Sequence, residues 1–291
     1  MTKLIEKKIA KPLLELQNEL GESPLWDAEY QMLYWLDIER GQVQTYSPES
    51  KDYQVIDLET KAGCIAFTQK GQLLVATPNG LAFWNENEGL GPNQIEFFSA
   101  EDARMMNDGK VDSYGNFWVG SKGPKKASSL YRVTRGFRYQ TMIDDVTISN
   151  GLDWSPNLQY FFFCDSGVNS IYRFNYTPLV GVLGGAELFL TTYEGTPDGL
   201  TVDAHGNIWV AIWDGWKVIG LTPEGEIFCE IHLPVSRPTS VAFGGPHMNE
   251  LFITSARTGL SADSLNREPF AGSLFSIRLN TLGLPSNKFA D

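Results

Sequence analysis

The feature that most restricts the fold of this 291-residue chain is a recurring pair of short apolar runs separated by a polar turn. The clearest copy, residues 197–211, opens with Pro-Asp-Gly and carries Gly206-Asn207 between its two runs. Short runs rich in β-branched and aromatic residues on either side of a turn predict a β-hairpin. Six copies can be recognised, at residues 21–37, 64–76, 107–120, 149–162, 197–211 and 239–255.

The copies follow one another at intervals of roughly 40 to 48 residues, the length of a four-stranded propeller blade. Weaker apolar segments supply the remaining strands, at residues 43–46, 81–84, 129–133, 170–174 and 218–221. No linker divides the chain, so we expect a single domain over residues 1–291. The predicted fold is all-β, a six-bladed β-propeller. A strand near residues 13–16 is expected to pair with residues 273–278 and close the ring, which would remove an exposed sheet edge.

Composition narrows the class of partner. The formal net charge of −12 would repel a phosphate backbone, so nucleic-acid binding is not expected. The N-terminus lacks an apolar signal core, and no run reaches the ~18 apolar residues of a membrane span. Three widely separated cysteines, Cys64, Cys164 and Cys229, indicate reduced, mostly buried thiols. A cytoplasmic protein without a membrane partner is therefore expected.

Polar side chains stand just before the first strand of several copies: Glu22, Asn107, Asp108, Asn150 and Asp198. In a propeller these first strands line the central channel, so the side chains would converge at one of its ends. Carboxylate and amide oxygens suit calcium, magnesium or manganese, and no histidine falls at these positions to build a zinc site. Asp or Asn before Gly is also common turn chemistry. Recurrence at equivalent positions favours a metal site at one end of the channel.

Other recurring residues have structural interpretations. Asp112, Asp153 and Asp203 are interpreted as polar contacts within hairpins and between blades. Trp118, Trp154 and Trp209 are predicted to pack between blades.

Four segments together resemble the SMP-30/gluconolactonase/LRE-like family, which includes regucalcin: Gly-Glu-Ser-Pro-Leu-Trp at 21–26, Asn-Asp-Gly-Lys-Val-Asp at 107–112, Ser-Asn-Gly-Leu-Asp-Trp at 149–154 and Pro-Asp-Gly-Leu at 197–200. The resemblance implies a six-bladed propeller that binds one divalent cation and hydrolyses sugar lactones. By position it implies Glu22, Asn150 and Asp198 as metal ligands. It also implies Asn107 as a contact to substrate or bound water, and Asp198 as the general base.

Two segments depart from the family pattern. The family often has Arg-x-Asn-Asp-Gly, with the arginine on substrate hydroxyls, whereas Arg104 here lies one residue further from Asn107. A shift by one residue in an extended segment turns a side chain to the opposite face, although a loop could compensate. A glutamate that some relatives carry is missing from the basic loop at residues 121–128. Lys125 or Lys126 could meet an anionic substrate there, or the loop could be a solvated surface.

The predicted function is that of a metal-dependent lactonase, a carboxylic ester hydrolase, acting on a gluconolactone-like aldonolactone as its small-molecule partner. A divalent cation polarises the lactone carbonyl, and a neighbouring carboxylate deprotonates water. Calcium is favoured, with magnesium, manganese and zinc open. The alternatives are an organophosphate hydrolase of the diisopropylfluorophosphatase type and a non-catalytic calcium-binding propeller, because a fold alone does not define a function. The oligomeric state stays open.

Overall fold

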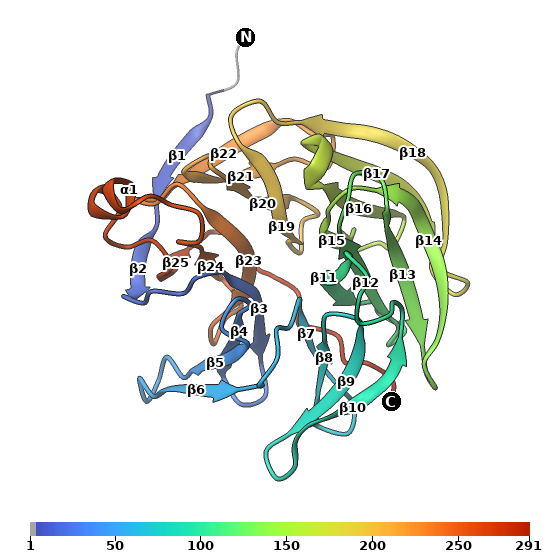
Figure 1. Cartoon of the computed structure of the whole chain (residues 1–291). Coiled ribbons are helices and arrows are strands. Elements are labelled where there is room, and N and C mark those ends of the chain that lie inside the picture. The colour runs from blue at the N-terminus through green and yellow to red at the C-terminus, as the bar shows by residue number, and fades with distance from the viewer. Residues whose placement is uncertain (1–3) are drawn as a thin grey trace.

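The computed structural model describes residues 4–291, which form six β-sheets arranged as blades around a central axis (Figure 1). The six-bladed β-propeller is confirmed. The strands of the first three blades are β3 (Gly21–Asp27), β4 (Met32–Asp37), β5 (Gln42–Tyr46), β6 (Tyr53–Asp57); β7 (Ile65–Phe67), β8 (Leu73–Ala76), β9 (Gly80–Asn85), β10 (Gly89–Glu96); and β11 (Met105–Val111), β12 (Phe117–Lys122), β13 (Ser128–Thr134), β14 (Arg138–Val146).

The last three blades continue the pattern and include the ends of the ring. Their strands are β15 (Ser149–Trp154), β16 (Tyr160–Asp165), β17 (Ser170–Thr177), β18 (Val182–Thr191); β19 (Thr196–Val202), β20 (Ile208–Trp213), β21 (Lys217–Leu221), β22 (Ile227–His232); and β23 (Pro238–Gly244), β24 (Glu250–Ser255), β25 (Leu274–Arg278). Two short helices interrupt them: η1 (Ser166–Val168) and α1 (Ala262–Arg267).

The N-terminal segment closes the ring, as predicted, with pairing slightly earlier in the chain than expected. Strand β2 (Lys11–Leu14) pairs antiparallel with β25 and completes the sixth blade. Strand β1 (Glu6–Ile9), which the sequence analysis did not foresee, adds to the fifth blade parallel to β22. One segment thus supplies the outermost strand of two neighbouring blades and ties them together.

The core lies between blades, because the middle strands are apolar on both faces and buried, as in β8 and β20. Trp118 packs edge-on against Trp154 of the next blade, with ring centroids 5.6 Å apart. Trp209 belongs to a cluster shared with the sixth blade. The three tryptophans therefore pack between blades, as predicted. Asp112 and Asp203 accept the indole N–H of Trp118 and Trp209 at 2.9 and 3.1 Å and fix their own hairpins.

The first strand of each blade lies innermost, and these strands contact one another around the ring. In five blades the inner strand carries a register shift, located between Glu22 and Leu25, Met106 and Gly109, Ser149 and Leu152, Pro197 and Leu200, and Pro238 and Val241. Such β-bulges re-aim side chains. The polar residues selected from the sequence lie at these bulges.

Two glycines explain the Asn-Gly and Asp-Gly pairs of the repeats. A Cβ on Gly151 would meet the backbone of residues 198–200, and one on Gly199 would meet Ser240 of the next inner strand. Glycine is therefore needed here for the close approach of neighbouring strands. Turn chemistry, the alternative interpretation of these pairs, is not their role at residues 150–151 and 198–199, which lie within β15 and β19.

The C-terminal segment crosses one end of the channel. Backbone hydrogen bonds join Gly283 to Met248 of the sixth blade, Phe289 to Phe67 of the second and Ala290 to the third. Phe289 is fully buried in the cluster between the second and third blades. This segment therefore links blades that are far apart along the chain.

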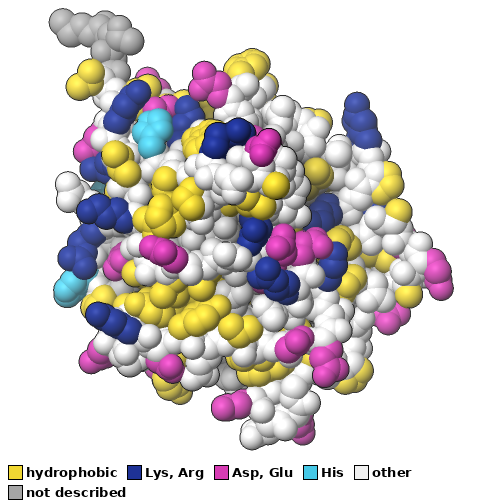
Figure 2. Space-filling view, turned by 60° about the vertical axis from the view of Figure 1, so that its left-hand side comes forward, with side chains coloured by type: hydrophobic (Ala, Val, Ile, Leu, Met, Phe, Trp, Pro, Cys, Tyr) yellow, Lys and Arg dark blue, Asp and Glu magenta, His cyan; other side chains and the backbone are white. Residues whose placement is uncertain are grey.

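The three cysteines are free and buried, as predicted. Among residues 4–291, no helix is long and apolar enough to cross a membrane. On the face shown in Figure 2, lysine and arginine side chains lie among aspartate and glutamate side chains.

Candidate metal centre and active site

The bulged inner strands place four of the predicted site residues in one pocket of about 320 Å³: Glu22, Asn107, Asn150 and Asp198. They come from the first, third, fourth and fifth blades, and each is at most 7% exposed. Leu20, Ile38, Ile148 and Trp213 contribute apolar walls. Residues far apart in sequence thus meet at one end of the channel.

Hydrogen bonds orient the two asparagines. Nδ2 of Asn107 donates to the Ser149 carbonyl at 2.8 Å and to Oδ1 of Asn150 at 3.3 Å. Nδ2 of Asn150 donates to Oγ of Ser166 at 2.9 Å, and that hydroxyl donates to the Pro197 carbonyl at 2.6 Å. This series of hydrogen bonds fixes the Asn150 side chain with its amide nitrogen directed toward Ser166. Its carbonyl oxygen keeps a second lone pair for another partner.

Burial and mutual repulsion raise the pKa values of the carboxyl groups in and beside this pocket. Burial, followed by the charges of Asp198 and Asp108, holds the pKa of Glu22 well above its usual range. Burial, followed by the charge of Asp108, does the same to the pKa of Asp198. Burial also raises the pKa of Asp108 to about 6, although the Gly109 N–H donates to its Oδ1 at 2.7 Å. Ionised carboxylates so close together need a positive partner.

The residues present fit a hard divalent cation. Oδ1 of Asp198 is buried and has no hydrogen-bond partner among the described residues. Glu22 and Asp198 offer carboxylate oxygens, and Asn150 offers an amide oxygen, the ligand types of calcium and magnesium. No group of three or more His, Cys, Asp or Glu side chains in residues 4–291 is placed to hold a metal. The candidate set therefore depends on the amide of Asn150 as its third ligand.

Arg104 lies outside this pocket. Its guanidinium pairs with Asp102 through Nε at 3.0 Å and Nη2 at 2.7 Å and lies 4.3 Å from the centre of the Phe98 ring. It lines a separate pocket of about 600 Å³ beside the third blade. The structure does not bring Arg104 together with the other predicted site residues, and its contact with a substrate stays a prediction.

Two residues of the pocket were missed by sequence reasoning. Ser166 follows strand β16 with no motif to mark it. Lys122 ends β12 and lines the pocket, whereas Lys125 and Lys126, which the sequence analysis considered, are exposed. Alternation along β12 buries Ser121 and turns Lys122 to the other face, but no motif in the sequence marks where this strand ends.

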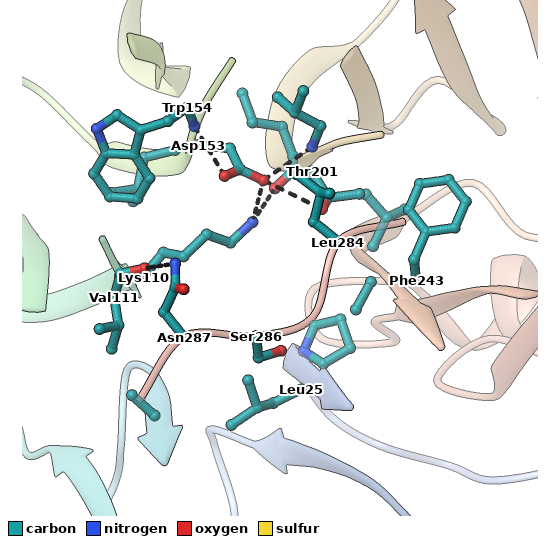
Figure 3. A pocket seen from close by; sticks show the side chains of 18 of the residues that line it. Leu25, Lys110, Val111, Asp153, Trp154, Thr201, Phe243, Leu284, Ser286 and Asn287 are labelled. Atoms are coloured by element: carbon teal, nitrogen blue, oxygen red, sulfur yellow. Dashed lines mark hydrogen bonds and ion pairs between the residues drawn. The ribbon is translucent and has the colours of Figure 1, made fainter. Parts of the chain in front are cut away.

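A second cavity of about 450 Å³ occupies the channel beyond the bulges (Figure 3). In it, Nζ of Lys110 contacts Oδ2 of Asp153 at 2.7 Å, and the Val202 N–H donates to the same oxygen at 2.9 Å. The contact between blades predicted for Asp153 is thus confirmed. Leu284 and Asn287 of the C-terminal segment line this cavity. The ion pair and the Val202 hydrogen bond together link the third, fourth and fifth blades here. The candidate metal centre lies at the other side of the bulges.

Known proteins share this architecture. Residues 20–257 match the SMP-30/Gluconolactonase/LRE-like region. The chain is 34% identical over 288 residues to the 6-deoxy-6-sulfogluconolactonase of Pseudomonas putida, covering 96% of this chain and 98% of that protein. It is 32% identical over 283 residues to the regucalcin of Gallus gallus, covering 93% and 95%. A solved structure of a calcium-binding protein, regucalcin, from Agrobacterium tumefaciens matches with a TM-score of 0.93 and 26% identity over 99% of both chains. The chain therefore belongs to the SMP-30/gluconolactonase/LRE-like family.

Proposed function

We propose that this protein is a divalent-metal-dependent hydrolase that opens the ester of a sugar lactone. The observation that carries the proposal is the buried, unpartnered Oδ1 of Asp198 beside a second buried carboxylate, Glu22. Membership of the family supports it, as does the name of the P. putida relative, a lactonase of a sulfonated gluconolactone. A regucalcin described as calcium-binding supports calcium as the first cation to test, with magnesium, manganese and zinc as alternatives.

In this proposal Glu22, Asn150 and Asp198 hold the cation. When bound, a divalent cation polarises the lactone carbonyl and stabilises the negative charge that develops on its oxygen. Ser166 fixes the orientation of the Asn150 amide through the hydrogen bond to Nδ2. The apolar side chains in the pocket lining lower the local dielectric constant, which strengthens the electrostatic interactions inside it.

Asp198 is also the proposed general base and takes the proton of the attacking water on a carboxylate oxygen. A carboxylate has two oxygens, so one oxygen of Asp198 can bind the cation while the other accepts the proton; its Oδ1 has no hydrogen-bond partner among the described residues. Asn107 is proposed to position substrate. Its Nδ2 is used by Ser149 and Asn150, while within residues 4–291 no protein donor is found for its Oδ1. That oxygen can accept a hydrogen bond from a sugar hydroxyl.

The test compares wild type with Asp198→Asn on glucono-1,5-lactone, using a pH indicator. Loss of a general base costs about 10²- to 10⁴-fold in rate, so the variant should fall by at least 10²-fold. Asp145→Asn is the matched control, because this exposed residue in β14 lies outside the pocket. Near-normal turnover by Asp198→Asn would sink the assignment of the base.

The same assay includes diisopropyl fluorophosphate as a second substrate. Turnover of the organophosphate without lactone hydrolysis would favour a phosphotriesterase-like enzyme. Tight metal binding without turnover of either compound would favour a non-catalytic propeller.

A further inference from the structure

A lysine lies among the carboxylates of the candidate metal centre. Lys122 is the last residue of β12, where its backbone pairs with Met105 on one side and bridges to Ile148 on the other. Ser121, the preceding residue, is buried and hydrogen-bonds to the backbone of Ser129. Alternation along the strand therefore turns Lys122 to the opposite face, where it lines the pocket. Among the described residues, it is the only basic side chain that does so.

The ammonium group of Lys122 is available for a ligand. Within residues 4–291 it has no ion pair or hydrogen bond, whereas Lys110 and Lys217 hold carboxylates at 2.7 and 2.8 Å. Lys125 and Lys126 are exposed and lie outside the pocket lining. The loop therefore contributes a single cation to the site.

The positive charge of Lys122 acts on the two carboxyl groups of the pocket. It opposes the rise in pKa of both Glu22 and Asp198. A divalent cation held by Glu22 and Asp198 would offset the charges of these two carboxylates, which leaves the ammonium of Lys122 as the unbalanced charge of the lining. A loaded pocket with an excess positive charge attracts an anion more strongly than a neutral molecule.

We propose that Lys122 is a specificity-determining residue that binds a negatively charged substituent, such as a sulfonate, phosphate or carboxylate, on the lactone. The inference rests on the proposed function and narrows its substrate class to anionic sugar lactones. Lys122 belongs to the third blade and Asp198 to the fifth, so the charged group and the ester are held by different sides of the pocket. An ammonium offers three donors, and its hydrogen bonds to an anion are charge-assisted.

The experiment measures kcat/KM for glucono-1,5-lactone and for its 6-deoxy-6-sulfo derivative. The metal-loaded proteins compared are wild type, Lys122→Met, Lys122→Arg and the control Lys125→Met. A hydrogen bond to a charged group is worth about 10- to 100-fold, so Lys122→Met should lose that factor on the sulfonated lactone. Any loss that arises because the charge of Lys122 acts on Glu22 and Asp198 should be common to both lactones, so the ratio of the two kcat/KM values, sulfonated over neutral, should fall by about 10- to 100-fold in Lys122→Met. Lys122→Arg should retain the preference, and Lys125→Met should match wild type.

A binding measurement separates this inference from the proposed function. Calorimetry compares binding of two open-chain acids, 6-deoxy-6-sulfogluconate and gluconate, to wild type and Lys122→Met. Weaker binding of the sulfonated acid alone supports the role of Lys122 even if no lactone is hydrolysed, an outcome that overturns only the proposed function. An equal loss on charged and neutral compounds would show that Lys122 merely balances the carboxylates. No loss on either compound would also overturn the inference.

Discussion

Replacing Asp108 by Asn should stabilise the metal-free protein at neutral pH, although Asp108 lies beside the predicted ligands. Burial raises its pKa to about 6 from an ordinary value of 3.8. A carboxyl whose pKa is raised by folding favours the folded state at low pH, and that contribution is lost as the pH rises through the raised pKa. Asn keeps an oxygen to accept the Gly109 N–H and carries no charge at any pH.

The size of the effect follows from the two pKa values. A difference of about two pKa units corresponds to about 3 kcal/mol of unfolding free energy. Asp108 lines the channel cavity, so water there screens its charge, and this value is an upper bound. At about 2.1 cal/mol/K of unfolding entropy per residue, 3 kcal/mol corresponds to a rise in Tm of about 5 °C for a chain of this length.

The assay is thermal and denaturant-induced unfolding of chelator-treated wild type, Asp108→Asn and the exposed control Asp145→Asn between pH 4 and pH 8. Wild type and Asp108→Asn should have nearly equal free energies of unfolding near pH 4. The advantage of Asp108→Asn should grow to its full size by about pH 7, while Asp145→Asn follows wild type. A variant that is less stable than wild type at pH 7.5, or an advantage independent of pH, would show that burial does not raise the pKa of Asp108.

Three further predictions concern the frame around the site. Gly151→Ala should lower the free energy of unfolding in urea by about 1–3 kcal/mol, because the added Cβ would meet the backbone of the next inner strand. The control Gly185→Ala, whose Cβ would meet no other atom within 4 Å, should change the free energy of unfolding by less than about 0.5 kcal/mol. Ser166→Ala removes the acceptor that orients Asn150, and metal titration followed by thermal shift should show affinity weakened by about 10- to 100-fold. Phe289→Ala should cost about 3–5 kcal/mol of unfolding free energy, since this C-terminal side chain is fully buried between two blades; a loss below 1 kcal/mol would show that the segment is dispensable.

The blades and the convergence of Glu22, Asn107, Asn150 and Asp198 were predictable because both depend on a repeat. Apolar runs with a regular interval define the hairpins, and equivalent positions in a closed ring meet at one place. In the pairs at residues 150–151 and 198–199, the glycine is needed for the close approach of the inner strand of the next blade. The periodicity of the sequence was therefore enough to predict the fold and the residues at the centre of the site.

Features that do not repeat along the chain could not be predicted in this way. Bulges break the strict alternation of side chains, so the direction of Arg104 could not be deduced from its distance to Asn107. Lys122 has no equivalent in the other copies of the repeat, and it reaches the pocket because β12 extends as far as this residue. The C-terminal segment bonds to several blades through backbone groups, which carry no sequence signature. Strand β1 likewise pairs through its backbone with a distant strand.

We propose that a cation held by Glu22, Asn150 and Asp198 drives lactone hydrolysis. The most direct measurement is glucono-1,5-lactone and sulfonated-lactone hydrolysis by chelator-treated protein, before and after addition of calcium, magnesium, manganese or zinc, with Glu22→Gln alongside. We expect little activity without metal, recovery on addition of at least one cation, and little recovery in Glu22→Gln. Full activity in chelator, unchanged by the Glu22→Gln substitution, would show that this cation has no part in the reaction.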